Sequence, residues 1–166
     1  MILSVRRLSY SELKKSLNKQ QKIVVLSCNN CAKKCLGLGG RVGLKALSDK
    51  LEKDGFNLIH RELVGFACSV DLVSKRGKEE STREYFSQAD VILTLACEDG
   101  EHAVANAFPA VSVPKLNRTL GIGWGSPSLG VRLTHPISGI TLEIDLPEGI
   151  PLDEAAKKLN LESGSF

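Results

Sequence analysis

KIVVLSCNNCAKKCLGLGGRVG, residues 22–43, is the stretch of the chain that decides the fold. It begins with a continuous apolar run, Ile23–Leu26, of the kind that forms a strand buried on both faces of a parallel sheet. A cluster of cysteines follows, and a glycine-rich turn then leads into an amphipathic pattern that predicts a helix. The cysteines of this cluster are Cys28, Cys31 and Cys35. The stretch therefore predicts a strand, a thiol-rich turn and a helix in succession.

Further apolar segments downstream predict the neighbouring strands. They are Phe56–Leu63, Asp90–Ala96 and the shorter Ala110–Val113. Helices are expected between them, over about 41–53, from Ser69 onward, over about 79–88 and over about 99–107. Strands that alternate with helices are typical of a parallel sheet with right-handed crossovers and helices on both faces. We therefore predict an α/β fold with one four-stranded parallel sheet, flavodoxin-like or Rossmann-like, in the strand order 2-1-3-4.

The segment before the first strand, residues 1–21, is expected to be a helical lead-in. Ser9 and Glu12 have the spacing of a capping box, in which each side chain caps the backbone N–H of the other residue. This pattern predicts a helix over about 11–19.

The last third of the chain, residues 117–166, is expected to form an appendage to the α/β domain of residues 22–116. Its predicted elements are an irregular glycine-rich loop over 117–130, a C-terminal β-hairpin of Val131–Thr134 and Ile140–Ile144, and a short helix over Leu152–Leu159.

The remaining cysteines, Cys68 and Cys97, follow the ends of the second and third predicted strands. In open parallel sheets, ligands bind beyond the carboxyl ends of the strands, near the point where the strand order reverses. All five cysteines are therefore expected to converge on one edge of the sheet.

Composition and charge exclude several classes of function. A formal charge of +3 and an aromatic content of 5% leave little material for binding nucleic acid. No apolar run approaches the roughly 20 residues of a membrane span. Arg6 and Arg7 stand where a signal peptide would need apolar residues, so a cytoplasmic location is expected. In that compartment, clustered cysteines are metal ligands or redox thiols more often than disulfides.

An iron–sulfur cluster is the interpretation that these thiols favour. A [4Fe–4S] cluster needs four thiolates, commonly three from a local motif and one from elsewhere in the chain. Cys97 is the preferred fourth ligand over Cys68, because it ends the strand expected to lie directly beside the first. Backbone N–H groups of the glycine-rich turn would stabilise the negative charge of the cluster. The glycines of that turn are Gly37, Gly39 and Gly40.

Two alternatives stay open at this point. The same thiolates are able to hold zinc tetrahedrally in a structural or assembly module, and sequence does not separate zinc from iron when every ligand is sulfur. Cys28 and Cys31 also have the Cys-x-x-Cys spacing of a thiol oxidoreductase, with a helix N-terminus that would lower a thiol pKa.

Several stretches, taken in order, make the chain resemble the small or C-terminal subunit of methylenetetrahydrofolate reductase, the MetV-like family of bacteria and archaea. They are SCNNCAKKCLGLGG (27–40), the isolated Cys68 before a helix, VILTLAC (91–97) and VPKLNRTLGIG (113–123). The similarity covers about residues 20–123. It implies an α/β domain with iron–sulfur or zinc chemistry, more an accessory subunit than an independent enzyme. Its partner would be a flavin-containing catalytic subunit, or another one-carbon or corrinoid protein.

The chain departs from the family pattern at two places. Family members commonly carry a second cysteine-rich segment near the C-terminus, whereas this sequence has no cysteine after Cys97. Cys97 is also followed by Glu98-Asp99-Gly100, where the family tends to have glycine. The first departure removes a second metal centre, and the second places negative charge beside the proposed cluster.

Overall fold

The computed structural model describes residues 1–144 and 147–166, and it contains two sheets rather than one. The elements in chain order are β1 (Ile2–Arg6), α1 (Tyr10–Ser16), β2 (Ile23–Cys28), α2 (Cys31–Lys34), α3 (Gly40–Lys53), β3 (Leu58–Val64), α4 (Val70–Lys78), α5 (Arg83–Gln88), β4 (Val91–Leu95), α6 (Glu98–Ala107), β5 (Asn117–Ser126), β6 (Gly130–Pro136), β7 (Ile150–Pro151) and α7 (Leu152–Lys158).

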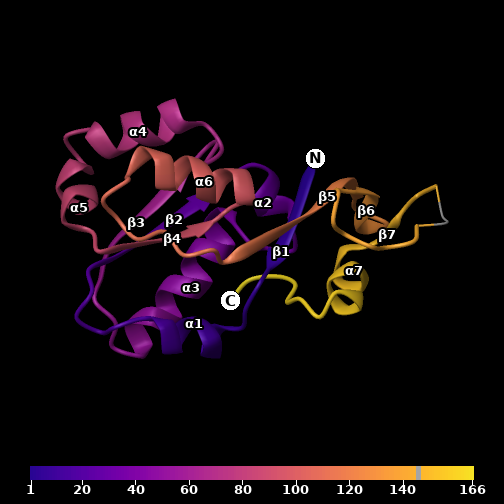
Figure 1. The fold of residues 1–166 in the computed structure, drawn as a ribbon, viewed down its shortest axis with the longest axis horizontal. Helices are drawn as coiled ribbons and strands as arrows, with labels where there is room; N and C mark the ends of the chain where they lie inside the picture. Colours follow the sequence, from indigo (N-terminus) through magenta and orange to yellow (C-terminus); the bar gives the residue numbers. More distant parts are fainter. Residues whose placement is uncertain (145–146) are drawn as a thin grey trace.

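The first sheet is parallel and has the order β3-β2-β4. Every residue of β2 is buried, as its continuous apolar run predicted, because the strand is central and both of its faces are covered. Helices α4 and α6 cover one face and α1 and α3 the other (Figure 1). Alternate β2 residues enter two different cores: Ile23 and Val25 pack with Leu47 of α3, while Val24 and Leu26 pack in the larger core with Val104 of α6.

The predicted four-stranded parallel sheet is wrong, because its fourth strand does not form. In the predicted strand Ala110–Val113, only Ser112 makes a bridge, with Val91 at the start of β4. Pro109 and Pro114 flank this short segment, and proline lacks the N–H that a ladder needs. The parallel sheet is therefore three-stranded, and the remaining strands build a second sheet.

The second sheet is antiparallel, with the order β1-β5-β6-β7. Strand β1 lies in the segment expected to be only a helical lead-in, and it pairs with β5 from Ile2 opposite Ile122 to Arg6 opposite Asn117. Strand β5 occupies the segment expected to be an irregular loop. Its glycines are needed because the neighbouring backbone comes close: a Cβ on Gly121 would lie 2.0 Å from the carbonyl oxygen of His135, and one on Gly123 equally close to that of Arg132.

The predicted hairpin lies one segment too late along the chain. The observed hairpin joins β5 to β6 through residues 127–129, and the hydroxyl of Ser126 accepts a hydrogen bond from the N–H of Leu129 across this turn. Segment 140–144 forms no strand, and β7 takes the place beside β6 instead. The glycines of β5 were interpreted as signs of a loop, so the hairpin was predicted between the next two segments instead of between β5 and β6.

The helices agree better with the sequence. The capping box of α1 is confirmed, with Ser9 and Glu12 capping one another's backbone N–H groups. Helix α7 matches the predicted C-terminal helix, and the chain after it returns to β1, where Arg6 and Glu162 exchange backbone hydrogen bonds. Within the described ranges, no helix is long and apolar enough to cross a membrane.

Candidate functional site

The site begins at Cys28, the last residue of the buried strand β2. Its thiol is buried and faces the carbonyl oxygen of Gly65, 3.8 Å away, in the loop after β3. Because β2 and β3 run parallel, Cys28 and Val64 stand in register at the carboxyl edge of the sheet. The strand thus delivers the first thiol to the edge where the sequence predicted it.

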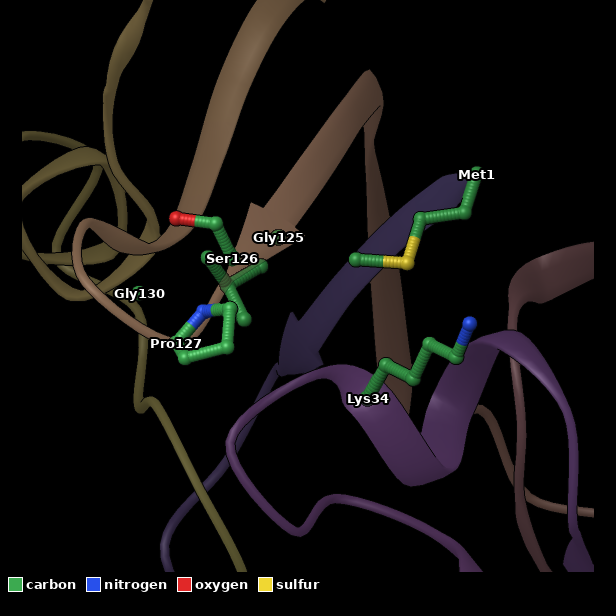
Figure 2. A pocket seen from close by; sticks show the side chains of 7 residues that line it. Met1, Lys34, Gly125, Ser126, Pro127 and Gly130 are labelled. Atoms are coloured by element: carbon green, nitrogen blue, oxygen red, sulfur yellow. The ribbon is translucent and has the colours of Figure 1, made fainter.

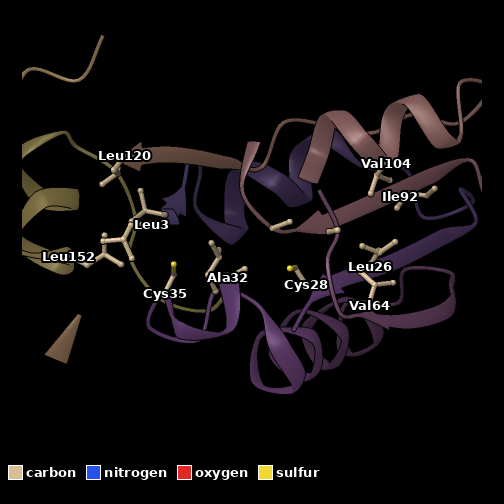
Figure 3. Packing of buried hydrophobic residues seen from close by; sticks show 14 of the residues in the cluster. Leu3, Leu26, Cys28, Ala32, Cys35, Val64, Ile92, Val104, Leu120 and Leu152 are labelled. Carbon is tan, nitrogen blue, oxygen red and sulfur yellow. The ribbon is translucent and has the colours of Figure 1, made fainter. Parts of the chain in front are cut away.

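Helix α2 carries the next thiol and determines the position of Cys35. Cys31 is the first residue of this four-residue helix and is half-buried, while Cys35 is its C-cap and is 1% exposed. Figure 3 shows that Cys35 lies beside Leu3, with Ala32 between it and Cys28 in that view. The buried thiols of Cys28 and Cys35 therefore lie in different parts of the core.

Hydrogen bonds tie Cys35 to strand β1. Its sulfur accepts from the backbone N–H of Ser4 at 3.5 Å, and its S–H faces the carbonyl oxygens of Cys31 at 3.3 Å and Ile2 at 3.7 Å. Burial raises the pKa of Cys35 to about 11, despite the Ser4 N–H, so the thiol is neutral at pH 7. Sequence reasoning missed this contact because it missed β1.

Cys68 and Cys97 approach the same edge from the other strands. Cys68 is exposed in the loop between β3 and α4, and Cys97 is half-buried at the N-cap of α6. Burial raises the pKa of Cys97 to about 11, opposed by a hydrogen bond from the backbone of Gly100. Burial also raises the pKa of Cys68, with a further contribution from Cys28.

Neighbouring thiols add smaller contributions to these raised pKa values. They are Cys31, Cys97 and Cys28 for the pKa of Cys35, Cys68 and Cys28 for that of Cys97, and Cys28 and Cys31 for that of Cys68. All are free thiols. Even so, within residues 1–144 and 147–166 no three His, Cys, Asp or Glu side chains form a ready-made metal-binding group. The donor chemistry suits a soft metal or an iron–sulfur cluster, whereas the side chains need to reorient before they bind one.

The turn between α2 and α3 carries Cys35 and has a strained backbone. Leu36 adopts φ +53°, a left-handed conformation that is strained for leucine, and Gly37 follows at φ +81°. Helix α2 has no side-chain cap, and four residues give it little stability of its own. The turn that carries Cys35 is therefore held by its contacts with β1 more than by its own conformation.

The three glycines predicted to face a cofactor have structural roles in this protein. A Cβ on Gly39 would lie 2.7 Å from that of Ala32 and 2.8 Å from the carbonyl oxygen of Cys28, so this glycine lets α3 begin tightly against β2. Gly40 has φ +69°, and a Cβ there would meet the Lys33 side chain at 2.8 Å. With Gly37 they shape the turn that places Cys31 and Cys35.

The charge of Glu98, the residue after Cys97, is compensated within the protein, whereas Asp99 is exposed and helps to raise the pKa of Cys97. The carboxylate of Glu98 forms ion pairs with Arg7 and, at 3.3 Å, with Arg118, and it accepts a hydrogen bond from the N–H of Thr119 at 2.9 Å. Burial alone would raise the pKa of Glu98, but these groups outweigh it and lower that pKa. The sequence did not predict these ion pairs, because Arg7 directly follows β1 and Arg118 lies in β5, and neither strand was predicted.

Glu101, one turn further along α6, is a buried acid, although its place in the first turn of a helix predicted only a capping role. Its Oε1 accepts hydrogen bonds from the N–H of Leu116 at 2.7 Å, from the N–H of Asn117 at 2.9 Å and from the Asn117 side-chain amide at 2.8 Å. Burial raises the pKa of Glu101 to about 7, although these hydrogen bonds lower it. The carboxyl group thus joins α6 to the point where the chain enters β5.

A cavity of about 340 Å³ opens on the far side of α2, between that helix and the β5–β6 hairpin (Figure 2). Met1, Lys34 and the turn residues Ser126 and Pro127 line it, and no cysteine is among its described lining residues. The cavity is therefore separate from the thiol edge, by which we mean the carboxyl edge of the parallel sheet with Cys28, Cys31, Cys35, Cys68 and Cys97.

Comparison of the chain with protein-family models, with curated proteins and with solved structures gives no match. The five free thiols of the thiol edge are thus the feature of the molecule that points to a function.

Proposed function

We propose that the thiol edge binds one [4Fe–4S] cluster and that the chain is an accessory subunit of a one-carbon oxidoreductase. The observation that carries this proposal is that three cysteine-bearing segments meet at the carboxyl edge of the parallel sheet: the end of β2 with α2, the loop after β3 and the N-cap of α6. All five cysteines in these segments are free thiols. Thiols lose their protons when they bind iron, and the positive iron–sulfur core offsets the repulsion between the resulting thiolates. A domain of this size buries enough surface to be stable without disulfides, so stability does not explain why five cysteines meet at one edge.

Cys28, Cys31, Cys35 and Cys97 are the proposed ligands, with Cys68 as the spare thiol. Cys35 is the most costly of them to recruit, because its sulfur has to leave the N–H of Ser4. Cys68 is exposed and lies near Cys28 and Cys31, which supports it as the replacement if Cys35 stays bound to β1. Zinc held by the same thiols is the alternative occupant.

The chemistry supplied by such a cluster, when bound, is one-electron transfer at a potential tuned by nearby charge and solvent. The chain's own contribution is to shield the centre and to set that charge. Arg7 and Arg118 offset Glu98 beside Cys97, so the acidic residue after this cysteine adds less negative charge than its position alone indicates. The proposed partner is a flavoprotein or corrinoid protein of one-carbon metabolism, in the cytoplasm, where free thiols persist.

Anaerobic purification tests this proposal directly. Iron, acid-labile sulfide and zinc are assayed, and the visible spectrum is taken before and after dithionite. A broad absorbance near ~400 nm that bleaches on reduction, together with iron and sulfide, is the expected result. Zinc in a colourless protein would replace the electron-transfer proposal with the assembly module, and metal-free protein would reject both.

Single cysteine variants then assign the ligands. Cys31→Ala and Cys97→Ala are expected to lose iron and sulfide, whereas Cys68→Ala retains them. Loss of the cluster in Cys68→Ala with retention in Cys35→Ala would show that Cys68 is the fourth ligand. Circular dichroism on each metal-free variant separates loss of ligand from loss of fold.

A further inference from the structure

Among the described residues, five of the eight exposed large apolar side chains lie in the segments that follow β2 and β3. Tyr85, Ile122 and Leu129 lie elsewhere, and the other exposed members of this class follow β2 or β3. These, defined as the edge surface, are Leu36 (42% exposed), Val42 (67%), Phe66 (51%), Val70 (38%) and Leu72 (49%). Because β2 and β3 are adjacent and parallel, the segments after them emerge at the same end of the sheet. Concentrated exposed apolar side chains mark interaction sites on soluble proteins.

Positive side chains surround the edge surface. Exposed cations stand on α2, at the start of α3 and along α4, and none takes part in an ion pair among the described residues: Lys33, Lys34, Arg41, Lys75 and Lys78. Asp71, Glu80 and Asp99 are exposed acids in the same region, and the half-buried Glu79 is paired with Arg76. The cations outnumber them, so the rim of the edge surface is positive.

A depression beside the edge surface offers room for a protruding side chain. It measures about 360 Å³ and is lined by residues at the end of β3 and along α4, including Val64, Leu72 and Lys75. Leu72 thus belongs both to the edge surface and to the wall of this depression. An apolar centre with a polar rim and a recess is the composition of a protein-binding site.

We infer that the edge surface docks a partner protein whose contact face has exposed apolar side chains ringed by Asp and Glu. The positive rim selects an acidic face by charge complementarity. A second copy of this chain is a poorer occupant, because a two-fold contact would bring two positive rims together. A membrane is also poorer, because the apolar residues come from several turns rather than from one amphipathic helix, and a recess is of no use to a lipid surface.

This inference deepens the proposed function by placing the partner next to the thiols, and it rests on that function only for the partner's role. The apolar and cationic residues bind without metal, so the test uses metal-free protein. Failure of cluster binding would therefore leave the docking result unchanged, and failure of docking would leave the metal assays unchanged.

The experiment uses two designed helical peptides with the same leucine stripe, one flanked by glutamates and the other by lysines. Each is titrated into ¹⁵N-labelled protein and followed by amide chemical shifts. The glutamate peptide is expected to shift amides around Val42 and Leu72 and to bind at least about tenfold more tightly than the lysine peptide. Equal binding of the two peptides, or shifts confined to the β5–β6 hairpin, would overturn the inference.

Two variants make the result specific. Leu72→Ser with Lys75→Glu alters exposed positions of α4 and is expected to weaken binding of the glutamate peptide about tenfold or more. Leu129→Ser, at an equally exposed position in the hairpin turn, is the matched control and leaves the affinity unchanged. Sedimentation that shows dimers, or binding to phosphatidylserine vesicles in preference to the glutamate peptide, would overturn the choice of occupant.

Discussion

The molecule has a parallel half (β2, β3, β4 and helices α1 and α3 to α6) and an antiparallel half (β1, β5, β6, β7 and α7). Different features of the sequence determine the fold of each half. In the parallel half, the continuous apolar run of β2 and the largely apolar β4 are close in sequence to helices that cover them. The antiparallel half depends on β1 meeting β5, where Ser4 and Thr119 are 115 positions apart. One core nevertheless runs through both halves, from Leu26 to Leu3 and Leu152. Local pattern therefore specifies one half, and long-range pairing specifies the other.

Leu26→Ala is the change with the largest expected effect, because it removes a fully buried side chain from that shared core. We expect a loss of about 2–5 kcal/mol in the free energy of unfolding, measured by urea denaturation. Val42→Ala, at a 67% exposed position, is the control and should stay within about 0.5 kcal/mol. A second unfolding transition in the wild type would contradict the single shared core.

The pH dependence of stability tests the junction between the halves at Glu101. Its pKa in the folded protein is about 7, above the ordinary 4.5, so folding favours the protonated acid. That contribution is fully present below about pH 4.5 and is lost as pH rises through about 7, a change on the order of 3 kcal/mol.

Metal-free protein should therefore be more stable at pH 5 than at pH 8 by urea denaturation. Glu101→Gln retains an acceptor for Leu116 and Asn117 and removes the titration. The difference in stability between the two pH values should shrink in this variant, and an unchanged difference would show that another group is responsible.

Gly123→Ala tests the close pairing of β5 with β6. A Cβ there would lie 2.0 Å from the carbonyl oxygen of Arg132, so the strands have to separate, at a cost of about 1–3 kcal/mol. Gly125→Ala is the matched control in the same strand, because its Cβ would have no neighbour closer than 3.5 Å. Thermal unfolding of both variants measures the difference, and equal stabilities would show that β5 pairs less closely than described.

Ser9→Ala has the smallest expected effect and concerns a purely local signal. It removes the cap of α1 and should cost about 1 kcal/mol of stability. Ser9→Asp keeps an acceptor for the N–H of Glu12 and should restore most of the loss. Equal stability of all three proteins by urea denaturation would mean that tertiary packing alone holds this helix.

The comparison also explains which features the sequence predicted. Ile23–Leu26 is apolar without interruption and Val91–Leu95 is apolar except at Thr94, so their strands were recognisable. Strand β5 was missed because glycine is common both in loops and in strands whose neighbours come close, and only the position of β6 distinguishes the two cases. Strand β1 was missed because it is five residues long and its partner lies far along the chain.

The candidate site shows the same division. The approach of Cys28, Cys68 and Cys97 to one edge follows from the ends of parallel strands, so it was predictable from the positions of those strands. The attachment of Cys35 to Ser4 was not predictable, because it depends on β1. Burial of Glu101 was hidden for the same reason, since its hydrogen-bond donors stand at the start of β5.

The separation of β1 from β5 along the chain has a consequence for biosynthesis. A ribosome that adds about 5–20 residues per second needs on the order of ten seconds to make the 115 residues between Ser4 and Thr119. Strand β1 is made first and waits without its β5 partner during that interval, while the segment that carries Cys28, Cys31 and Cys35 is already complete. The nascent chain thus passes through a stage in which Cys35 is not yet enclosed by the finished antiparallel sheet.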